Sequence, residues 1–364
     1  MKIRARNILY WALVFVPLAL IVRYAWPESH TLIFALAAIA IIPLAGIMGR
    51  ATEHLADKTT EGIGGLLNAT FGNMAEIIIA VLALRQGLYS IVKASLTGSI
   101  IGNALLILGL SMLVGGLKFK TQSFSGAGAR TRSTTLTLAA VALIAPAAYH
   151  YLAGPGAAPG EARLSLAIGI VLMATYFLSL IFALHTHTDY FTRDAARAAD
   201  VESSHHTWSI RRSLIVLTSA TVFVGWLAEI LVSAVEPTAE ALGMTEVFIG
   251  IVVVAIVGNA AEHSTAILMA LEDRMDLTVG IAIGSSTQIA LFAAPLLVFL
   301  SYAIGPEPMN LVFTSAEVLA IGLSVIIVSR VAVDGESNWL EGVQLLAVYL
   351  ILAAVFFFLP EAAH

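Results

Sequence analysis

Apolar residues dominate long stretches of this chain, and polar residues gather between them. A helix needs about 20 consecutive, mostly apolar residues to cross the ~30 Å hydrocarbon core of a bilayer. Eleven stretches meet this length, so the pattern predicts an all-α polytopic membrane protein with about eleven transmembrane helices. They cover residues 8–26, 31–49, 62–85, 90–116, 133–153, 163–185, 212–235, 246–271, 277–303, 310–330 and 338–359.

The longest polar stretch, residues 186–211, separates two groups of five predicted spans. We therefore expect four parts: an extra N-terminal transmembrane helix (1–30), a first five-helix repeat (31–185), a cytoplasmic linker (186–211) and a second five-helix repeat (212–359). Because each group holds an odd number of spans, the second would enter the membrane with the opposite orientation. Inverted repeats with a binding site near the midplane are a recurrent transporter design.

The composition supports a membrane protein. The 364 residues are 59% apolar and 12% charged, with a mean hydropathy of +0.91, whereas a soluble domain has about 25% charged residues. The chain leaves no polar segment long enough for a separate soluble domain, so we expect a lipid bilayer around it and no nucleic-acid partner. It has no cysteine, which excludes disulfides and thiolate metal sites.

The distribution of Lys and Arg predicts the orientation. With the N-terminus in the cytoplasm, 15 of the 19 Lys and Arg residues fall on the inner side, as the positive-inside rule requires. The C-terminus of an eleven-span chain then lies outside. We expect an integral protein of a prokaryotic inner (plasma) membrane, and we leave open whether it forms a homo-oligomer.

Two glutamates in apolar stretches carry the strongest chemical signal. Glu76 closes the sequence Gly-Asn-Met-Ala-Glu (72–76), and Glu262 closes Gly-Asn-Ala-Ala-Glu (258–262). A shift of 186 positions superposes residues 63–105 on 249–291 without a gap, and 13 of the 43 aligned pairs are identical. The shared glycines and polar residues indicate an internal duplication. Charged residues at bilayer depth are rare and usually functional.

The position of these glutamates predicts an ion site. They lie about 14 and 16 residues into their spans, which at about 1.5 Å per residue is near the membrane centre. If Glu76 and Glu262 face each other across the repeat, they supply the two negative charges that one divalent cation requires. Hard oxygen ligands suit Ca²⁺ and Mg²⁺. Two protonated glutamates that only hold helices together would be the structural alternative.

Further polar residues accompany each glutamate. Asn73 and Asn259 precede the glutamates by three residues, so we expect amide and carboxylate to share one helix face. Gly72 and Gly258 permit close helix approach or a local unwinding that exposes carbonyls. The next span in each half adds one hydroxyl and one amide, and His263 is a candidate for a proton path. The predicted site residues are Glu76, Glu262, Asn73, Asn259, Gly72, Gly258, Ser99, Ser285, Asn103 and Gln288.

These motifs resemble the Ca²⁺/H⁺ antiporter (cation/proton exchanger) family of the cation/Ca²⁺ exchanger superfamily. The resemblance rests on Gly-Asn-x-Ala-Glu in both halves, Gly-Ser-Ile-Ile-Gly-Asn (98–103), Gly-Asn-Ala-Ala-Glu-His (258–263) and Gly-Ser-Ser-Thr-Gln-Ile (284–289). It implies eleven spans, alternating access, and Glu76 and Glu262 as both Ca²⁺ ligands and proton carriers. Sodium-coupled relatives typically have Pro-Glu in the first motif and Asp in the second. Neither is present, which favours protons.

Three other interpretations compete with a Ca²⁺/H⁺ antiporter. A Na⁺-coupled exchanger, or a carrier of another divalent ion, would use similar ligands. An intramembrane hydrolase is disfavoured because the chain has no His-Glu-x-x-His and no paired aspartates. A channel is disfavoured because inverted repeats suit alternating access. We therefore expect no enzymatic activity and no cofactor. Near the span ends, Glu53, Glu229 and Glu236 are candidates to line an access route, and a solvated position is the alternative favoured for Glu53 and Glu236.

Overall fold

The computed structural model describes residues 11–59, 64, 67–68, 70–154, 158–186 and 208–360. Within these ranges the protein is almost entirely helical, as the apolar pattern predicts. The predicted linker, residues 186–211, lies largely outside the described residues. The chain divides into two compact units, and each takes part of both sequence halves.

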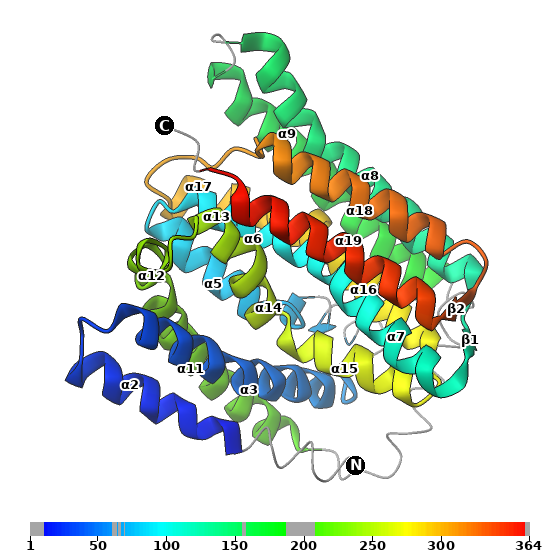
Figure 1. The fold of residues 1–364 in the computed structure, drawn as a ribbon, viewed down its shortest axis with the longest axis horizontal. Helices are drawn as coiled ribbons and strands as arrows, with labels where there is room; N and C mark the ends of the chain where they lie inside the picture. Colours follow the sequence, from blue (N-terminus) through cyan, green and yellow to red (C-terminus); the bar gives the residue numbers. More distant parts are fainter. Residues whose placement is uncertain are drawn as a thin grey trace. The chain divides into compact units, whose positions relative to one another are not determined.

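The first unit contains residues 1–95, 207–261 and 357–364. Its long helix α3 packs along α11 and α2, and these three helices lie side by side in Figure 1. The shorter helices α5 and α14 also contact α3 and each other. The helices of this unit are α2 (Phe15–Ala25), α3 (His30–Ala56), α5 (Met74–Arg85), α11 (Ile210–Ser233), α12 (Val235–Leu242), α13 (Glu246–Phe248) and α14 (Ala255–Gly258), and it also holds the first half of α6 (Tyr89–Ile101).

The second unit contains residues 96–206 and 262–356. Here α8 packs against α9, α16 and α18, and α17 packs against α9. Figure 1 shows α8, α9 and α18 as neighbours. The helices are the second half of α6, then α7 (Leu108–Phe119), α8 (Gly126–Ala153), α9 (Ala158–Ile181), α16 (Met275–Gln288), α17 (Ala294–Ile304), α18 (Ser315–Val331) and α19 (Trp339–Phe358), together with most of α15 (Ala260–Leu271).

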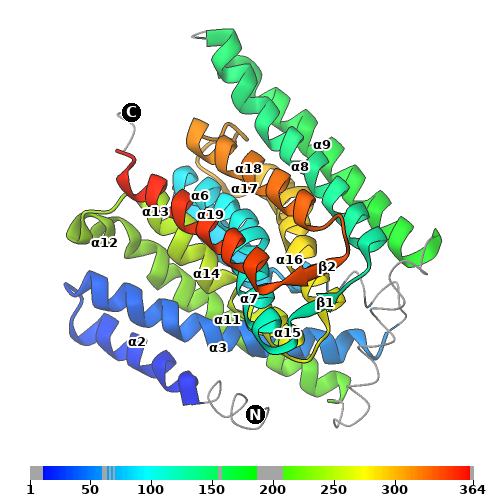
Figure 2. The same cartoon turned by 45° about the vertical axis from the view of Figure 1, so that its right-hand side comes forward.

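A short hairpin-like pairing joins two distant loops of the second unit. Strand β1 (Thr121–Ser123) follows α7, strand β2 (Glu336–Asn338) precedes α19, and the two pair antiparallel. Figure 2 shows them beside each other. Because the end of α7 and the start of α19 meet at this pair, the two helices run antiparallel. The Gln122 amide also donates to Ala270 O (2.9 Å), which ties this pair to the end of α15.

Seven helices of the described residues are long and apolar enough to cross a membrane. An eighth candidate is the pair Val235–Leu242 and Glu246–Gly258, which is bent by 113°. The predicted spans at 8–26, 62–85 and 310–330 appear as shorter helices in the described residues, and α18 has 17 residues. The protein is therefore an all-α integral membrane protein, whose number of spans stays a prediction.

The two duplicated segments of the sequence also have the same secondary structure. Helix α5 runs from Met74 to Arg85, and α15 runs from Ala260 to Leu271, so both ends differ by the same 186 residues. Each helix is followed by a residue with positive φ, Gly87 (77°) in the first copy and Asp273 (59°) in the second. The two duplicated segments thus fold into the same helix with the same left-handed turn after it.

Candidate ion-binding site

Both acidic motifs lie where a helix is interrupted. Gly72 and Asn73 form a turn before α5. Asn259 forms a one-residue turn that separates helix α14 from helix α15. Glu76 and Glu262 each fall in the first turn of the helix that follows. Each asparagine stands at the break and each glutamate follows it by three residues, so the shared helix face of amide and carboxylate stays a prediction. Gly72 lies in the turn before α5, whereas Gly258 is the last residue of α14 and the turn follows it at Asn259.

This position favours a negative charge on the glutamates. The first turn of a helix has backbone N–H groups without partners in the helix and the positive end of its dipole, so it stabilises carboxylates. Both carboxylate oxygens of Glu76 and the Oε2 of Glu262 are closed off from solvent. Broken helices of this kind expose backbone groups for ion binding in membrane transporters.

Glu76 lies directly against the glycine of the other motif. A Cβ added to Gly258 would come within 2.5 Å of Glu76 Cγ and 3.5 Å of its Cδ. Both residues belong to the first unit. No side chain larger than glycine fits at position 258 while Glu76 keeps this place. The first motif thus meets the second, and Glu262 follows this contact by four residues along the chain.

The two motif asparagines are buried and held by the backbone. Asn259 is 0% exposed, and its Nδ2 donates to Ala255 O at 2.8 Å. This bond holds the side-chain amide against α14. Asn73 is 2% exposed, and its backbone carbonyl accepts from Ile77 N at 3.1 Å. Both asparagines are therefore buried at the helix breaks, and the bond to Ala255 O holds the side chain of Asn259 there.

In the second unit, α6 and α16 cross beside the two predicted serines. Ser286 Oγ donates to Ile100 O at 3.0 Å. Ser99 directly precedes Ile100, and Ser285 directly precedes Ser286. Both of these serines are buried. The bonded residues are 186 positions apart, which is the repeat offset, so the helices meet at equivalent positions.

The predicted amides lie at widened turns of these helices. Asn103 is 1% exposed and lies in a π-helical turn, Gly102–Ile107. Gln288 is half-buried, ends α16 and directly precedes the π-helical turn Ile289–Ala293. The two turns overlap when shifted by 186 positions. π-helical turns are rare and concentrate at functional sites.

His263 follows Glu262 in α15 and is buried, with 7% of its surface exposed. Its Nε2 has no hydrogen-bond partner among the residues that the structure describes. A buried imidazole nitrogen without a partner is unusual in a folded protein. His263 therefore keeps the candidacy for a proton path that the sequence suggested.

Two other buried carboxylates escaped the sequence reasoning. Glu161 accepts from His150 Nδ1 at 2.6 Å and from Asn310 Nδ2 at 3.1 Å. Glu317 accepts from Thr97 Oγ1 (3.2 Å) and from the backbone and hydroxyl of Thr314. Both carboxylates accept hydrogen bonds from neutral or half-exposed donors. We interpret Glu161 and Glu317 as residues that connect helices. Thr-x-x-Glu at 314–317 is a helix-start signal that would have located one of them.

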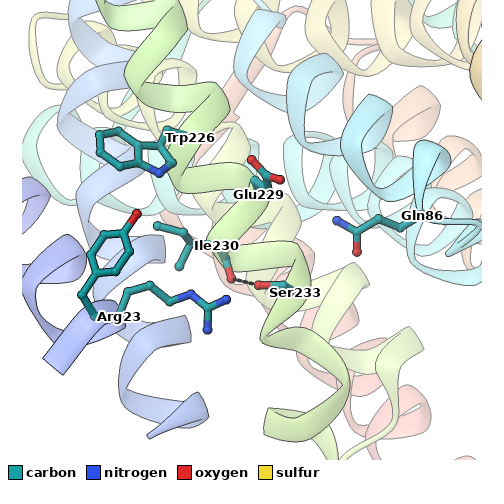
Figure 3. A pocket seen from close by; sticks show the side chains of 7 residues that line it. Arg23, Gln86, Trp226, Glu229, Ile230 and Ser233 are labelled. Atoms are coloured by element: carbon teal, nitrogen blue, oxygen red, sulfur yellow. Dashed lines mark hydrogen bonds between the residues drawn. The ribbon is translucent and has the colours of Figure 1, made fainter. Parts of the chain in front are cut away.

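The first unit also contains a pocket of about 320 Å³ (Figure 3). In this view Glu229 and Ser233 of α11 lie between Arg23 of α2 and Gln86 at the end of α5. Gln86 ends the helix that begins beside Glu76, and ten residues of helix span about 15 Å. The remaining lining residues are Tyr24, Trp226 and Ile230.

Paired interrupted helices, each with a carboxylate in its first turn, in an apolar helical protein define a membrane ion carrier. The chain belongs to the sodium/calcium exchanger protein family, whose model matches residues 29–185 and 212–358. The two matched segments run close to the predicted halves.

Curated relatives and solved structures are similar along almost the whole chain. The Ca²⁺/H⁺ antiporter of Synechocystis sp. is 42% identical over 96% of each chain. The Ca²⁺/H⁺ antiporter ChaA of Bacillus subtilis is 45% identical over 92% of this chain and 93% of its own. The crystal structure of the Ca²⁺/H⁺ antiporter YfkE matches with a TM-score of 0.82 and 42% identity, covering 97% of this chain and 100% of that one. The H⁺/Ca²⁺ exchanger CAX shares the fold alone, with a TM-score of 0.70 and 14% identity.

Proposed function

We propose that this protein is a secondary active antiporter that exchanges Ca²⁺ for H⁺ across a membrane. The observation that carries the proposal is the contact of Glu76 with Gly258, because it joins the two acidic motifs at interrupted helices. Relatives of more than 40% identity, covering nearly the whole chain, bear the name Ca²⁺/H⁺ antiporter. Na⁺-coupled exchange is the less supported alternative.

The Ca²⁺ ligands in this proposal are oxygen atoms from both motifs. Glu76 and Glu262 supply two negative charges, which neutralise one Ca²⁺ in an apolar surrounding. Amide oxygens of Asn73 and Asn259, and carbonyls freed at Gly72 and Gly258, complete a hard-oxygen set of the kind Ca²⁺ prefers. Ser99 on α6, Asn103 in the π-helical turn after it, and Ser285 and Gln288 on α16 line the approach to this set or bind the ion directly.

Proton coupling follows from the same carboxylates. Without Ca²⁺, two buried negative charges would repel each other and lack water, so the empty site takes up protons before it crosses the membrane. Ca²⁺ and H⁺ then compete for the same oxygens, and one site serves both ions. His263 is available to pass protons to or from it.

Alternating access is supported by the repetition of the fold. Both motif helices start and end at equivalent positions, and α6 and α16 meet at equivalent residues. In this proposal the halves have opposite orientation in the membrane, with the N-terminus inside and the C-terminus outside. The pocket around Glu229 then lies at the outer side, where its carboxylate attracts cations toward the end of α5.

The test is Ca²⁺-dependent proton movement in proteoliposomes. The purified protein should move Ca²⁺ in response to a pH gradient and move protons when a Ca²⁺ gradient is applied. A Na⁺ gradient at equal pH on both sides should drive no transport. Matched liposomes with the Glu76→Gln variant provide the background, and the exposed Glu240→Gln variant should behave as wild type. Ca²⁺ uptake driven by a Na⁺ gradient alone would contradict proton coupling and indicate a sodium-coupled exchanger.

A further inference from the structure

Two tyrosines of the second unit have buried hydroxyl groups outside the ion site. Tyr176 in α9 is 3% exposed, and Tyr349 in α19 is 5% exposed. Neither hydroxyl has a hydrogen-bond partner among the residues that the structure describes. A buried hydroxyl without a partner loses its hydration and gains nothing in return, so most such groups in proteins are bonded. Both tyrosines therefore require an explanation.

The two tyrosines occupy equivalent places in a second, less visible repeat. Residues 169–176 and 342–349 share the pattern Gly-x-x-Leu-x-Ala-x-Tyr, with an offset of 173 positions. In both copies the glycine, leucine and tyrosine lie on the buried face of the helix. Much of the rest of each helix is exposed, as expected for a lipid-facing surface.

The first copy packs against α17 and the turn before it. A Cβ on Gly169 would meet Phe299 Cε1 at 3.3 Å and Pro295 Cβ at 3.8 Å. Two turns along α9, the ring of Tyr176 lies 5.1 Å from the ring of Phe292. Phe292 belongs to the π-helical turn Ile289–Ala293. Tyr176 thus lies beside that turn.

The second copy packs against α7 in the same register. A Cβ on Gly342 would meet Gly109 O at 2.6 Å and would also collide with Leu113 N. Gly109 and Leu113 are the equivalents of Pro295 and Phe299 at the offset of 186. Because α7 and α19 run antiparallel, a residue two turns after Gly342, such as Tyr349, lies at the level of a residue two turns before Leu113. Continued over these two turns, the register brings Tyr349 level with Leu106, which belongs to the π-helical turn Gly102–Ile107.

Each tyrosine therefore accompanies one of the two π-helical turns beside the predicted ion ligands Asn103 and Gln288. In a π-helical turn the backbone bonds connect residues five apart, so the turn is wider than its neighbours and can rearrange into an α-helical turn. Such a rearrangement gives the backbone carbonyls of the turn new hydrogen-bond partners and changes their positions. Both tyrosine hydroxyls are donors beside these turns, and neither has a partner among the described residues.

We propose that Tyr176 and Tyr349 are a repeat-related pair of positioning residues for ion exchange. In the other conformation of the carrier, each hydroxyl donates a hydrogen bond to a carbonyl of its π-helical turn. The bond stabilises that conformation, and the unmade bond destabilises the one described here, so the pair brings the two states closer in free energy. This inference rests on the proposed alternating access.

The test uses Tyr176→Phe and Tyr349→Phe, which remove only the hydroxyl. Each variant should lower the rate of Ca²⁺ uptake in proteoliposomes about fivefold, the factor that a hydrogen bond of ordinary strength corresponds to. Ca²⁺ affinity in detergent should stay unchanged, and the melting temperature should be equal to or above that of wild type. The matched control is Tyr302→Phe in α17, whose side chain is 50% exposed. It should leave all three quantities unchanged.

Hydrogen–deuterium exchange separates this inference from the proposed function. Peptides that cover residues 100–107 and 287–293 should exchange more slowly in the matching phenylalanine variant, because the alternative turn has lost its hydrogen bond. This measurement needs no transported ion, so it stands even if wild type moves no Ca²⁺. Unchanged uptake and exchange, a lower melting temperature, or a loss of Ca²⁺ affinity would each overturn the positioning role.

Discussion

The side chain of Glu76 packs against the Cα of Gly258, and a Cβ at position 258 would come within 2.5 Å of Glu76 Cγ. The acidic residue of one motif is thus held by the glycine of the other. This contact explains why the second motif begins with glycine, and it makes position 258 as sensitive as the carboxylate itself.

Gly258→Ala should abolish Ca²⁺ transport, because the new methyl group displaces the Glu76 side chain. Overlap of this size in a packed region typically costs about 1–3 kcal/mol, so a folded but inactive protein is expected. Gly225→Ala in α11 is the matched control, since no heavy atom lies within 4 Å of its added Cβ. Uptake assays and melting curves on both variants check this. Near-normal transport by Gly258→Ala would contradict the importance of the contact.

Glu76→Gln and Glu262→Gln should each eliminate Ca²⁺ uptake while the protein stays folded. Glutamine keeps the size and one carbonyl oxygen but removes the charge that compensates the ion. Asn103→Ala and Gln288→Ala should weaken apparent affinity by a smaller factor, about tenfold or less, because water can replace a neutral ligand. Ca²⁺ flux and binding by calorimetry distinguish these classes. If either glutamine variant transports normally, the site lies elsewhere.

The pH dependence of Ca²⁺ binding should reveal a shared site. Protons neutralise the same carboxylates that bind Ca²⁺, so apparent Ca²⁺ affinity should fall as pH falls, and acid should release bound Ca²⁺. Titrations in detergent across the acid range measure this directly. An affinity that stays constant through that range would place the proton pathway on other residues.

Orientation can be tested with single cysteines, because the native chain has none. Ala127 and Leu152 lie near opposite ends of α8, and both are exposed. In intact cells an impermeant thiol reagent should label Leu152→Cys and leave Ala127→Cys unlabelled. The reverse result would invert the proposed topology, and labelling of Ala127→Cys after permeabilisation serves as the positive control.

The close contact of α7 and α19 predicts a large effect of one methyl group on stability. Gly342→Ala should lower the unfolding free energy by about 1–3 kcal/mol, because its Cβ would collide with the backbone of Leu113. Gly322→Ala in α18 meets its nearest atom only at 3.7 Å and should be neutral or stabilising. Chemical unfolding in detergent compares the two. Equal stability would contradict the observed packing.

Much of this protein was determined by the sequence alone. Long apolar stretches require helices in a bilayer, because unpaired backbone groups are too costly there. Two isolated carboxylates, each preceded by Gly, Asn and Ala at the same spacing, marked the motifs at Glu76 and Glu262, and the offset of 186 aligned them. These signals are local, so they were readable without a structure.

The tertiary structure decided the features that depend on contacts between distant segments. An apolar pattern is the same for a continuous and an interrupted helix, so it could not place the break at Asn259 or the 113° bend before it. The packing of Glu76 on Gly258 depends on segments 182 positions apart. The second offset of 173, which relates Tyr176 to Tyr349, is a short pattern in the sequence, and its structural meaning came from the matching contacts of Gly169 with α17 and of Gly342 with α7. Hydrophobicity sets which segments cross the membrane, and close packing decides which of their residues meet.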